Sequence, residues 1–187
     1  MSVVDLIKRR RSVPKMRPDP VPREVLERML DAAVWAPNHR LTEPWRFYVL
    51  QGDGKRRFAE IRRAVRAAAL PDPGAPEAQK ALERVYQDTL ATPAVIVVTA
   101  HQAADAETRR EDEYATFMAI QNMLLVAAEA GVGTYMRTGA ALMDHPDLRA
   151  LLHLEDDRRV VAVVYVGYPQ EVPQKRRTPA AERTVWL

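Results

Sequence analysis

The chain has 187 residues, a mass of 21.2 kDa, 47% apolar residues and a formal net charge of +3. This length and apolar content suffice for one hydrophobic core, so a single domain over 1–187 is expected. The absence of cysteine excludes disulfide scaffolds, thiolate metal sites, iron–sulfur clusters and cysteine nucleophiles, so any redox chemistry must belong to a bound cofactor.

The first half of the chain carries signals for three helices and one strand. Ser2 and Asp5 have the spacing of a capping box, which predicts a short helix that runs into three arginines. A regular apolar stripe follows Pro22 and stops before Pro37. In chain order we expect a helix after Ser2, a helix between Pro22 and Pro37, a strand over 45–51, an amphipathic helix with Phe58, Ile61 and Val65, and a surface loop over 71–76.

The second half contains two continuous apolar runs of strand length, AVIVVTA and VVAVVYV, which predict central strands buried on both faces. We expect a helix over 77–90, a strand over 94–100, a buried helix over 111–130, a strand over 131–137, a helix start at 144–146 and a strand over 160–166. This order favours an α+β fold over a regular βαβ repeat. The basic tail over 168–187 is expected to dock elsewhere, with a partner subunit as one possible place.

The location and the ligand class are less sharply defined by composition. The segment MSVVDLIKRRRS interrupts its apolar positions with charge, so we expect neither a secretory signal nor a membrane helix, and a cytoplasmic location. A net charge of +3 is compatible with an anionic small ligand and with nucleic acid. For nucleic acid, the available arginines are Arg9 to Arg11, Arg62, Arg63 and Arg66, together with the run 175–177, but aromatic residues amount to only 6% and no known binding motif surrounds them.

Two basic segments have the chemistry to hold a phosphate. Guanidinium groups and a hydroxyl, as in Arg10, Arg11 and Ser12, match a phosphate in charge and in hydrogen-bonding geometry. The simpler interpretation is a solvated helix end whose cations are favoured by the helix dipole. The run 175–177 has an equally simple interpretation as an exposed basic stretch.

Three further segments carry polar groups in informative places. His39 lies in the loop APNHRLTEPW, where it either contacts a ligand or is satisfied by backbone, and Trp45 is expected to pack in the core. Gln121 and Asn122 interrupt an apolar helix, which favours a hydrogen bond between helices. At a strand end, 136–138 places an arginine and backbone amides where an aromatic heterocycle could approach.

Other familiar site motifs are absent from the sequence. It contains no GxGxxG, no P-loop, no HExxH and no GxSxG, and its histidines show no convincing metal-ligand spacing. We therefore predict no metal site and no catalytic side chain of the nucleophilic kind.

The segments RRS at 10–12, APNHRLTEPWRF at 36–47, AIQNMLLVAAEAGVGTYMRTGA at 119–140 and VVYVGYPQ followed by KRR together resemble the FMN-dependent nitroreductase family, in its short bacterial NAD(P)H nitroreductase form. The resemblance implies a mostly antiparallel central sheet flanked by helices, and an intertwined homodimer with one FMN in each of two interface clefts. It also implies ping-pong transfer of two electrons from NAD(P)H to a nitroaromatic, a quinone or an enone. A family member with another redox reaction on FMN is the alternative.

The resemblance also assigns roles to individual residues, with the chemistry itself carried by FMN. Contacts to the flavin phosphate fall to Arg10, Arg11, Ser12, Lys175 and Arg177; contacts beside the ring fall to Met136, Arg137 and Thr138; and His39 reaches the FMN of the other subunit.

The sequence departs from the family pattern in three places. Many relatives carry a basic residue near the flavin N1/O2 edge where this chain has Pro14, so Lys15 or Arg137 becomes the candidate for that charge. Trp35 stands where some relatives have arginine, and Glu43 replaces the usual glutamine.

Overall fold

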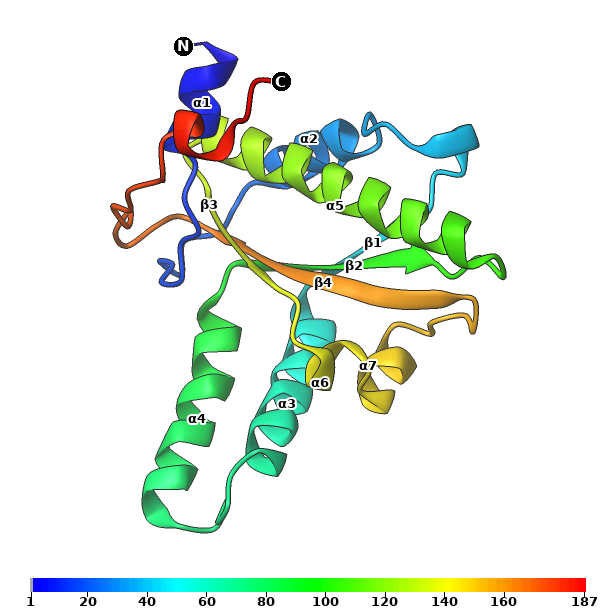
Figure 1. Cartoon of the computed structure of the whole chain (residues 1–187). Helices are drawn as coiled ribbons and strands as arrows, with labels where there is room; N and C mark the ends of the chain where they lie inside the picture. Colours follow the sequence, from blue (N-terminus) through cyan, green and yellow to red (C-terminus); the bar gives the residue numbers. More distant parts are fainter. Residues whose placement is uncertain (1) are drawn as a thin grey trace.

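The computed structural model describes residues 2–187 and shows a four-stranded sheet with helices on both faces (Figure 1). The strands lie side by side in the order β1-β2-β4-β3, and each neighbouring pair is antiparallel. Their bounds are β1 Trp45–Leu50, β2 Ala94–His101, β3 Gly133–Arg137 and β4 Arg158–Gly167. The expected α+β class is confirmed, and so are the two central strands.

The helices differ from the expectation at two points. Helix α5 begins five residues earlier than predicted, because the Asp105 side chain accepts a hydrogen bond from the Thr108 N–H and caps the helix there. Helix α6 was not predicted, since four residues are too few to show a periodic pattern. The bounds are α1 Val3–Arg9, α2 Arg23–Ala33, α3 Gly52–Ala68, α4 Pro76–Ala91, α5 Ala106–Glu129, α6 Ala140–Met143 and α7 Pro146–Leu151, with short 3-10 turns η1 His39–Leu41 and η2 Ala180–Arg183.

The sheet separates two hydrophobic cores. Alternate residues of β2, such as Ile96 and Val98, face the core formed with α2 and α5. The intervening residues, such as Val95 and Val97, face the core formed with α3, α6 and α7. Because both faces are covered, β2 and β4 are apolar at nearly every position. Helices α3 and α4 project from this second face as a hairpin (Figure 1).

Three local predictions are confirmed by contacts. The Ser2 hydroxyl accepts from the Asp5 N–H while the Asp5 carboxylate accepts from the Ser2 N–H, so the capping box is present. Trp45 is buried in the first core. The Asn122 side-chain amide donates to the Ala32 carbonyl at 3.1 Å, which ties α5 to the end of α2.

The segment after α1 lies along β3, the edge strand. Ser12 forms a parallel bridge with Thr134, and the Val13 N–H donates to the Thr134 carbonyl at 2.8 Å. Gly133 permits this approach, because a Cβ there would lie 3.0 Å from the Val13 side chain. The segment therefore brings the end of α1 and the strand-end residues of β3 onto one edge of the sheet.

The tail joins the same region. The Gln170 N–H donates to the Lys15 carbonyl at 3.1 Å, and Met16 forms an antiparallel bridge with Pro169. Beyond residue 170 nearly every side chain is exposed, and Val172 and Gln174 line a pocket together with Asp5 and Lys8 of α1.

Candidate functional site

Arg10 and Arg177, here called the rim arginines, come from opposite parts of the chain and lie close enough to influence each other. Burial lowers the pKa of Arg10, and the positive charges of Arg177 and Arg11 lower it further. Neither rim arginine has a side-chain hydrogen bond or ion pair among residues 2–187. Two cations held together without an internal counter-ion form a local site for an anion.

Arg11 is engaged differently. Its Nη1 donates to the carbonyl oxygens of Lys8 and of Arg10, the latter at 2.9 Å, at the carboxyl end of α1. These bonds satisfy helix-end carbonyls, which is the structural role that the helix-dipole interpretation gave it. Its Nε is buried with no partner in the described chain.

A cavity of about 1010 Å³ lies between α3 and α4, but its wall mixes acidic and basic side chains that are mostly exposed. A second cavity, of about 730 Å³, lies at the end of β3 and is here called the strand-end cavity. Met136, Arg137 and Thr138 all line it. Its wall also holds Arg62 and Arg66 and contains no carboxylate, and its volume is typical of small-molecule sites.

A smaller cavity of about 150 Å³, here called the inner cavity, shares part of this wall. Pro14, Arg62, Arg137 and Tyr165 line it, and Asp88 is its one acidic residue. Of the two residues expected to supply positive charge near the flavin N1/O2 edge, Arg137 lines both cavities and Lys15 lines neither.

Arg62 and Arg137, here called the wall arginines, lie over the same aromatic ring. The guanidinium carbons are 5.1 Å and 5.9 Å from the ring centroid of Tyr165, within the range of cation–π contact. Nη1 of Arg62 also donates to the buried hydroxyl of Thr89. Burial lowers the pKa of Arg62 and raises the pKa of Tyr165.

Arg62 was considered from the sequence only as one of several arginines available to nucleic acid. A sharper signal was present, because Arg62, Val65 and Arg66 of α3 and its capping residue Ala69 recur at helical spacing and all line the strand-end cavity. A helical stripe that contains apolar residues such as Val65 ordinarily indicates a face packed against the core. The basic residues of this stripe, Arg62 and Arg66, were therefore not assigned to a site.

His39 lies apart from the other candidates. Its Nδ1 is 2.7 Å from Oε2 of Glu111 near the amino end of α5, and its side chain is 57% exposed. After Glu111 the helix continues for 18 residues, roughly 27 Å, and strand β3 starts beyond that other end. Within one chain, His39 is therefore not brought to the rim or to the cavities.

The comparisons with known proteins agree with this architecture. The Nitroreductase family model matches residues 7–168. The chain belongs to the nitroreductase family. Over 182 residues it is 36% identical to "Putative NAD(P)H nitroreductase YfhC" of Bacillus subtilis, covering 96% of this chain and 91% of that protein.

Solved structures support the nitroreductase fold. A nitroreductase-like family protein from Bacillus cereus superposes with a TM-score of 0.85 at 30% identity, covering 100% of this chain and 96% of the other. The FMN- and NADPH-dependent nitroreductase NfnB, as a mutant from Sphingopyxis sp. strain HMH, superposes with a TM-score of 0.78 at 18% identity, covering 100% and 99%. The expected family and sheet architecture are thus confirmed.

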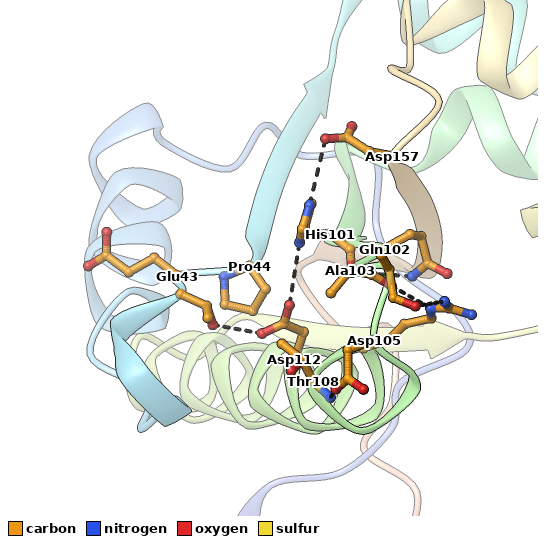
Figure 2. Close-up of polar contacts among 12 residues, drawn as sticks. Glu43, Pro44, His101, Gln102, Ala103, Asp105, Thr108, Asp112 and Asp157 are labelled. Carbon is orange, nitrogen blue, oxygen red and sulfur yellow. Dashed lines mark hydrogen bonds and ion pairs between the residues drawn. The ribbon is translucent and has the colours of Figure 1, made fainter.

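In this nitroreductase a polar network holds the loop that carries His39 (Figure 2). The Thr42 hydroxyl donates to Oδ1 of Asp112 at 2.6 Å, and Oδ2 of Asp112 is 3.5 Å from Nδ1 of His101. His101 Nε2 lies 3.7 Å from Asp157. Because the Asp112 carboxylate is buried, these contacts fix the loop on α5 and on the end of β2.

Two classes of feature are not found in the part of the nitroreductase that the structure describes. No group of three or more histidine and carboxylate side chains is arranged to hold a metal ion within 2–187. Over the same residues, no helix has the length and apolar character needed to cross a membrane.

Proposed function

We propose that this nitroreductase binds FMN and moves two electrons from NAD(P)H to an electron-poor acceptor such as a nitroaromatic, a quinone or an enone. The strand-end cavity, with its cationic wall at the edge of β3, carries the proposal. The names of the similar proteins support it, since YfhC is named for NAD(P)H and NfnB for both FMN and NADPH.

The donor set fits the phosphate of FMN. The two rim arginines repel each other and have no counter-ion among the described residues. A phosphate carries ~2 negative charges and several acceptor oxygens, so it would neutralise them. Ser12, exposed between the rim and β3, adds a hydroxyl donor. We assign the phosphate to Arg10, Ser12 and Arg177, with Lys175 and Arg11 beside them.

The strand-end cavity fits the flat ring of FMN. Met136, Arg137 and Thr138 border it, and the apolar side chains of Val65 and Leu142 exclude water from its wall. When bound, FMN supplies the hydride chemistry that a chain without cysteine lacks. Because donor and acceptor would use one cavity in turn, ping-pong kinetics are expected.

A second copy of the chain completes the proposal. Apolar side chains are exposed on α1, just after α2, on the long helix α5 and along the tail; they include Val3, Val4, Ile7, Trp35, Tyr114, Met118 and Trp186. We propose a homodimer that covers them, formed by two single-domain chains; since residues 168–170 and Arg177 contact their own chain, the part of the tail 168–187 that docks on the partner is the exposed end beyond Arg177. His39, remote from the site of its own chain, would then serve the cofactor of the other subunit, in a cytoplasmic enzyme supplied with NAD(P)H.

Absorption spectroscopy tests the proposed function. The purified protein, or the apoprotein after addition of FMN, should show a bound-flavin spectrum that NADH or NADPH bleaches without oxygen and nitrobenzene restores. Initial rates at several fixed acceptor concentrations should give parallel double-reciprocal lines. A colourless protein that does not bind added FMN, yet binds DNA with an affinity that falls steeply with salt, would support the nucleic-acid hypothesis instead.

A further inference from the structure

We propose that the wall arginines, Arg62 and Arg137, stabilise the reduced, anionic form of the flavin more strongly than its oxidised form. The inference deepens the function proposed above and rests on it. Arg62 is the new residue in this inference, because the family resemblance assigned it no contact with FMN.

The first step of the argument is position. Arg62 comes from α3 and Arg137 from the end of β3, yet their guanidinium groups lie over the one ring of Tyr165. Both line the strand-end cavity and both line the inner cavity beside Pro14. They therefore mark the place where the two cavities share a wall.

The second step is charge. No ion pair joins either wall arginine to a carboxylate within 2–187, although Asp88 lies in the inner cavity and partly offsets the charge of Arg62. Burial lowers the pKa of Arg62, and the positive charge of Arg137 lowers it further. At Arg62 the wall thus holds a positive charge whose solvation is already reduced, so negative charge nearby would be strongly favoured.

The third step is rigidity. The Thr89 hydroxyl accepts from Nη1 of Arg62 and itself donates to the Val85 carbonyl at 2.7 Å. This chain of bonds and the Tyr165 ring hold the guanidinium before any ligand arrives. A preorganised charge does not have to reorient when the charge of the ligand changes, which is the condition for a large electrostatic effect.

The fourth step is the chemistry of the ligand. When bound, FMN would accept a hydride from NAD(P)H, which is two electrons and one proton, and oxidised nicotinamide would leave. The neutral ring system would then carry one negative charge, spread over its N1 and O2 edge. Fixed positive charge near that edge favours the product over the starting form, and charge near N1 is a known way for a protein to tune a flavin.

The test compares adjacent arginines on one helix. Arg62→Gln and Arg137→Gln each remove one wall charge. Arg63→Gln is the matched control, because Arg63 also lies over a tyrosine, Tyr86, at 5.4 Å but lines neither cavity. The two readouts are the dissociation constant of oxidised FMN from the apoprotein and the midpoint potential of the bound flavin.

We expect each wall variant to lose about tenfold in its preference for reduced over oxidised FMN, which equals a fall of ~30 mV in midpoint potential for two electrons. The dissociation constant of oxidised FMN should change less than the preference does. Arg63→Gln should match the wild type in both readouts.

Arg62→Lys separates charge from packing. If the midpoint potential of Arg62→Lys stays close to the wild-type value, the charge is responsible. If it falls as far as the midpoint potential of Arg62→Gln, the inference is overturned. Wild-type potentials in both wall variants, in protein that binds FMN, also overturn it while leaving the proposed function intact. Failure of the wild type to bind FMN overturns the function itself. Arg137 is exposed, so its variant keeps the test valid if Arg62→Gln does not fold.

Discussion

The rim arginines and the wall arginines occupy the same edge of the sheet but differ in how they are held. Arg10 and Arg177 have no side-chain partners among the described residues and come from segments beside solvent. Arg62 is bonded to Thr89 and, with Arg137, lies over Tyr165. The rim pair makes no side-chain hydrogen bond or ion pair within 2–187, while the wall pair is held over an aromatic ring and its member Arg62 is also hydrogen-bonded and more deeply buried.

This difference suits the two pairs to different tasks. Exposed charges are screened by salt, so the rim is suited to a ligand group whose charge is large and permanent, such as a phosphate. Arg62 is more deeply enclosed than either rim arginine and is screened less, so the wall responds to a charge that appears during the reaction. Affinity should depend on the rim, and redox preference on the wall.

The largest expected effect comes from removing the rim contacts. Arg10→Ala combined with Ser12→Ala should weaken FMN binding by about 100-fold or more, because each charge-assisted hydrogen bond contributes ~1.5–3 kcal/mol. The midpoint potential at saturating FMN should stay at the wild-type value. Fluorescence titration measures the affinity, and Arg23→Ala, in an exposed pair with Glu27 on α2, is the control. Unchanged affinity would mean that the phosphate lies elsewhere.

A tenfold effect is expected from the tail. Arg177→Ala should weaken FMN binding by about tenfold, the value of one such bond, and Lys175→Ala should weaken it less. Of these two tail residues, Arg177 affects the pKa of Arg10 and Lys175 does not, which is the reason for the difference. Raising the salt concentration should reduce the difference in FMN affinity between Arg177→Ala and the wild type. Equal losses in both variants would contradict the pairing of Arg10 with Arg177.

A smaller effect tests the link between rim and wall. Gly133→Ala would place a methyl group 3.0 Å from the Val13 side chain, so Val13, next to Ser12, must shift by a few tenths of an ångström. We expect a loss of ~1–3 kcal/mol in the free energy of unfolding, as for other overpacked sites, with a severalfold weaker affinity for FMN. Chemical denaturation and titration measure these two losses. Gly54→Ala, whose Cβ would meet only Leu50 at 3.9 Å, should show neither.

The smallest effect concerns Tyr165. Its buried hydroxyl has no partner in the described chain, so Tyr165→Phe should change the free energy of unfolding by no more than about 1 kcal/mol at pH 7. Burial raises the pKa of the wild-type phenol, so its contribution is complete below the unfolded value near 10 and is lost as the pH rises through the folded value. Denaturation measured at neutral and at alkaline pH should show this loss of stability in the wild type and not in Tyr165→Phe. A large loss at pH 7 would reveal a partner for the hydroxyl.

Much of the fold follows from periodicity. The runs that became β2 and β4 are apolar on both faces, and the stripe after Pro22 became α2. Helix α6 was missed because a single turn leaves no periodic signal, and the start of α5 was missed because its first two turns are polar and only the Asp105 cap marks it.

The site was predictable where residues are adjacent in the sequence. Met136, Arg137 and Thr138 share one cavity because they are consecutive at a strand end. Arg62 was not predictable to the same degree, because its place in the wall depends on how α3 packs beneath the sheet. The Glu111 contact of His39 depends likewise on distant segments, since it joins a loop to a helix far along the chain.

The meeting of Arg10 with Arg177 also bears on when the enzyme acquires its cofactor. Synthesis proceeds from the amino terminus, so Arg10 and all four strands leave the ribosome before Arg177 does. A nascent chain that lacks the tail offers only half of the anion site. With the phosphate bound as proposed, loading with flavin would accordingly be a late event in biogenesis, following assembly of the sheet rather than guiding it.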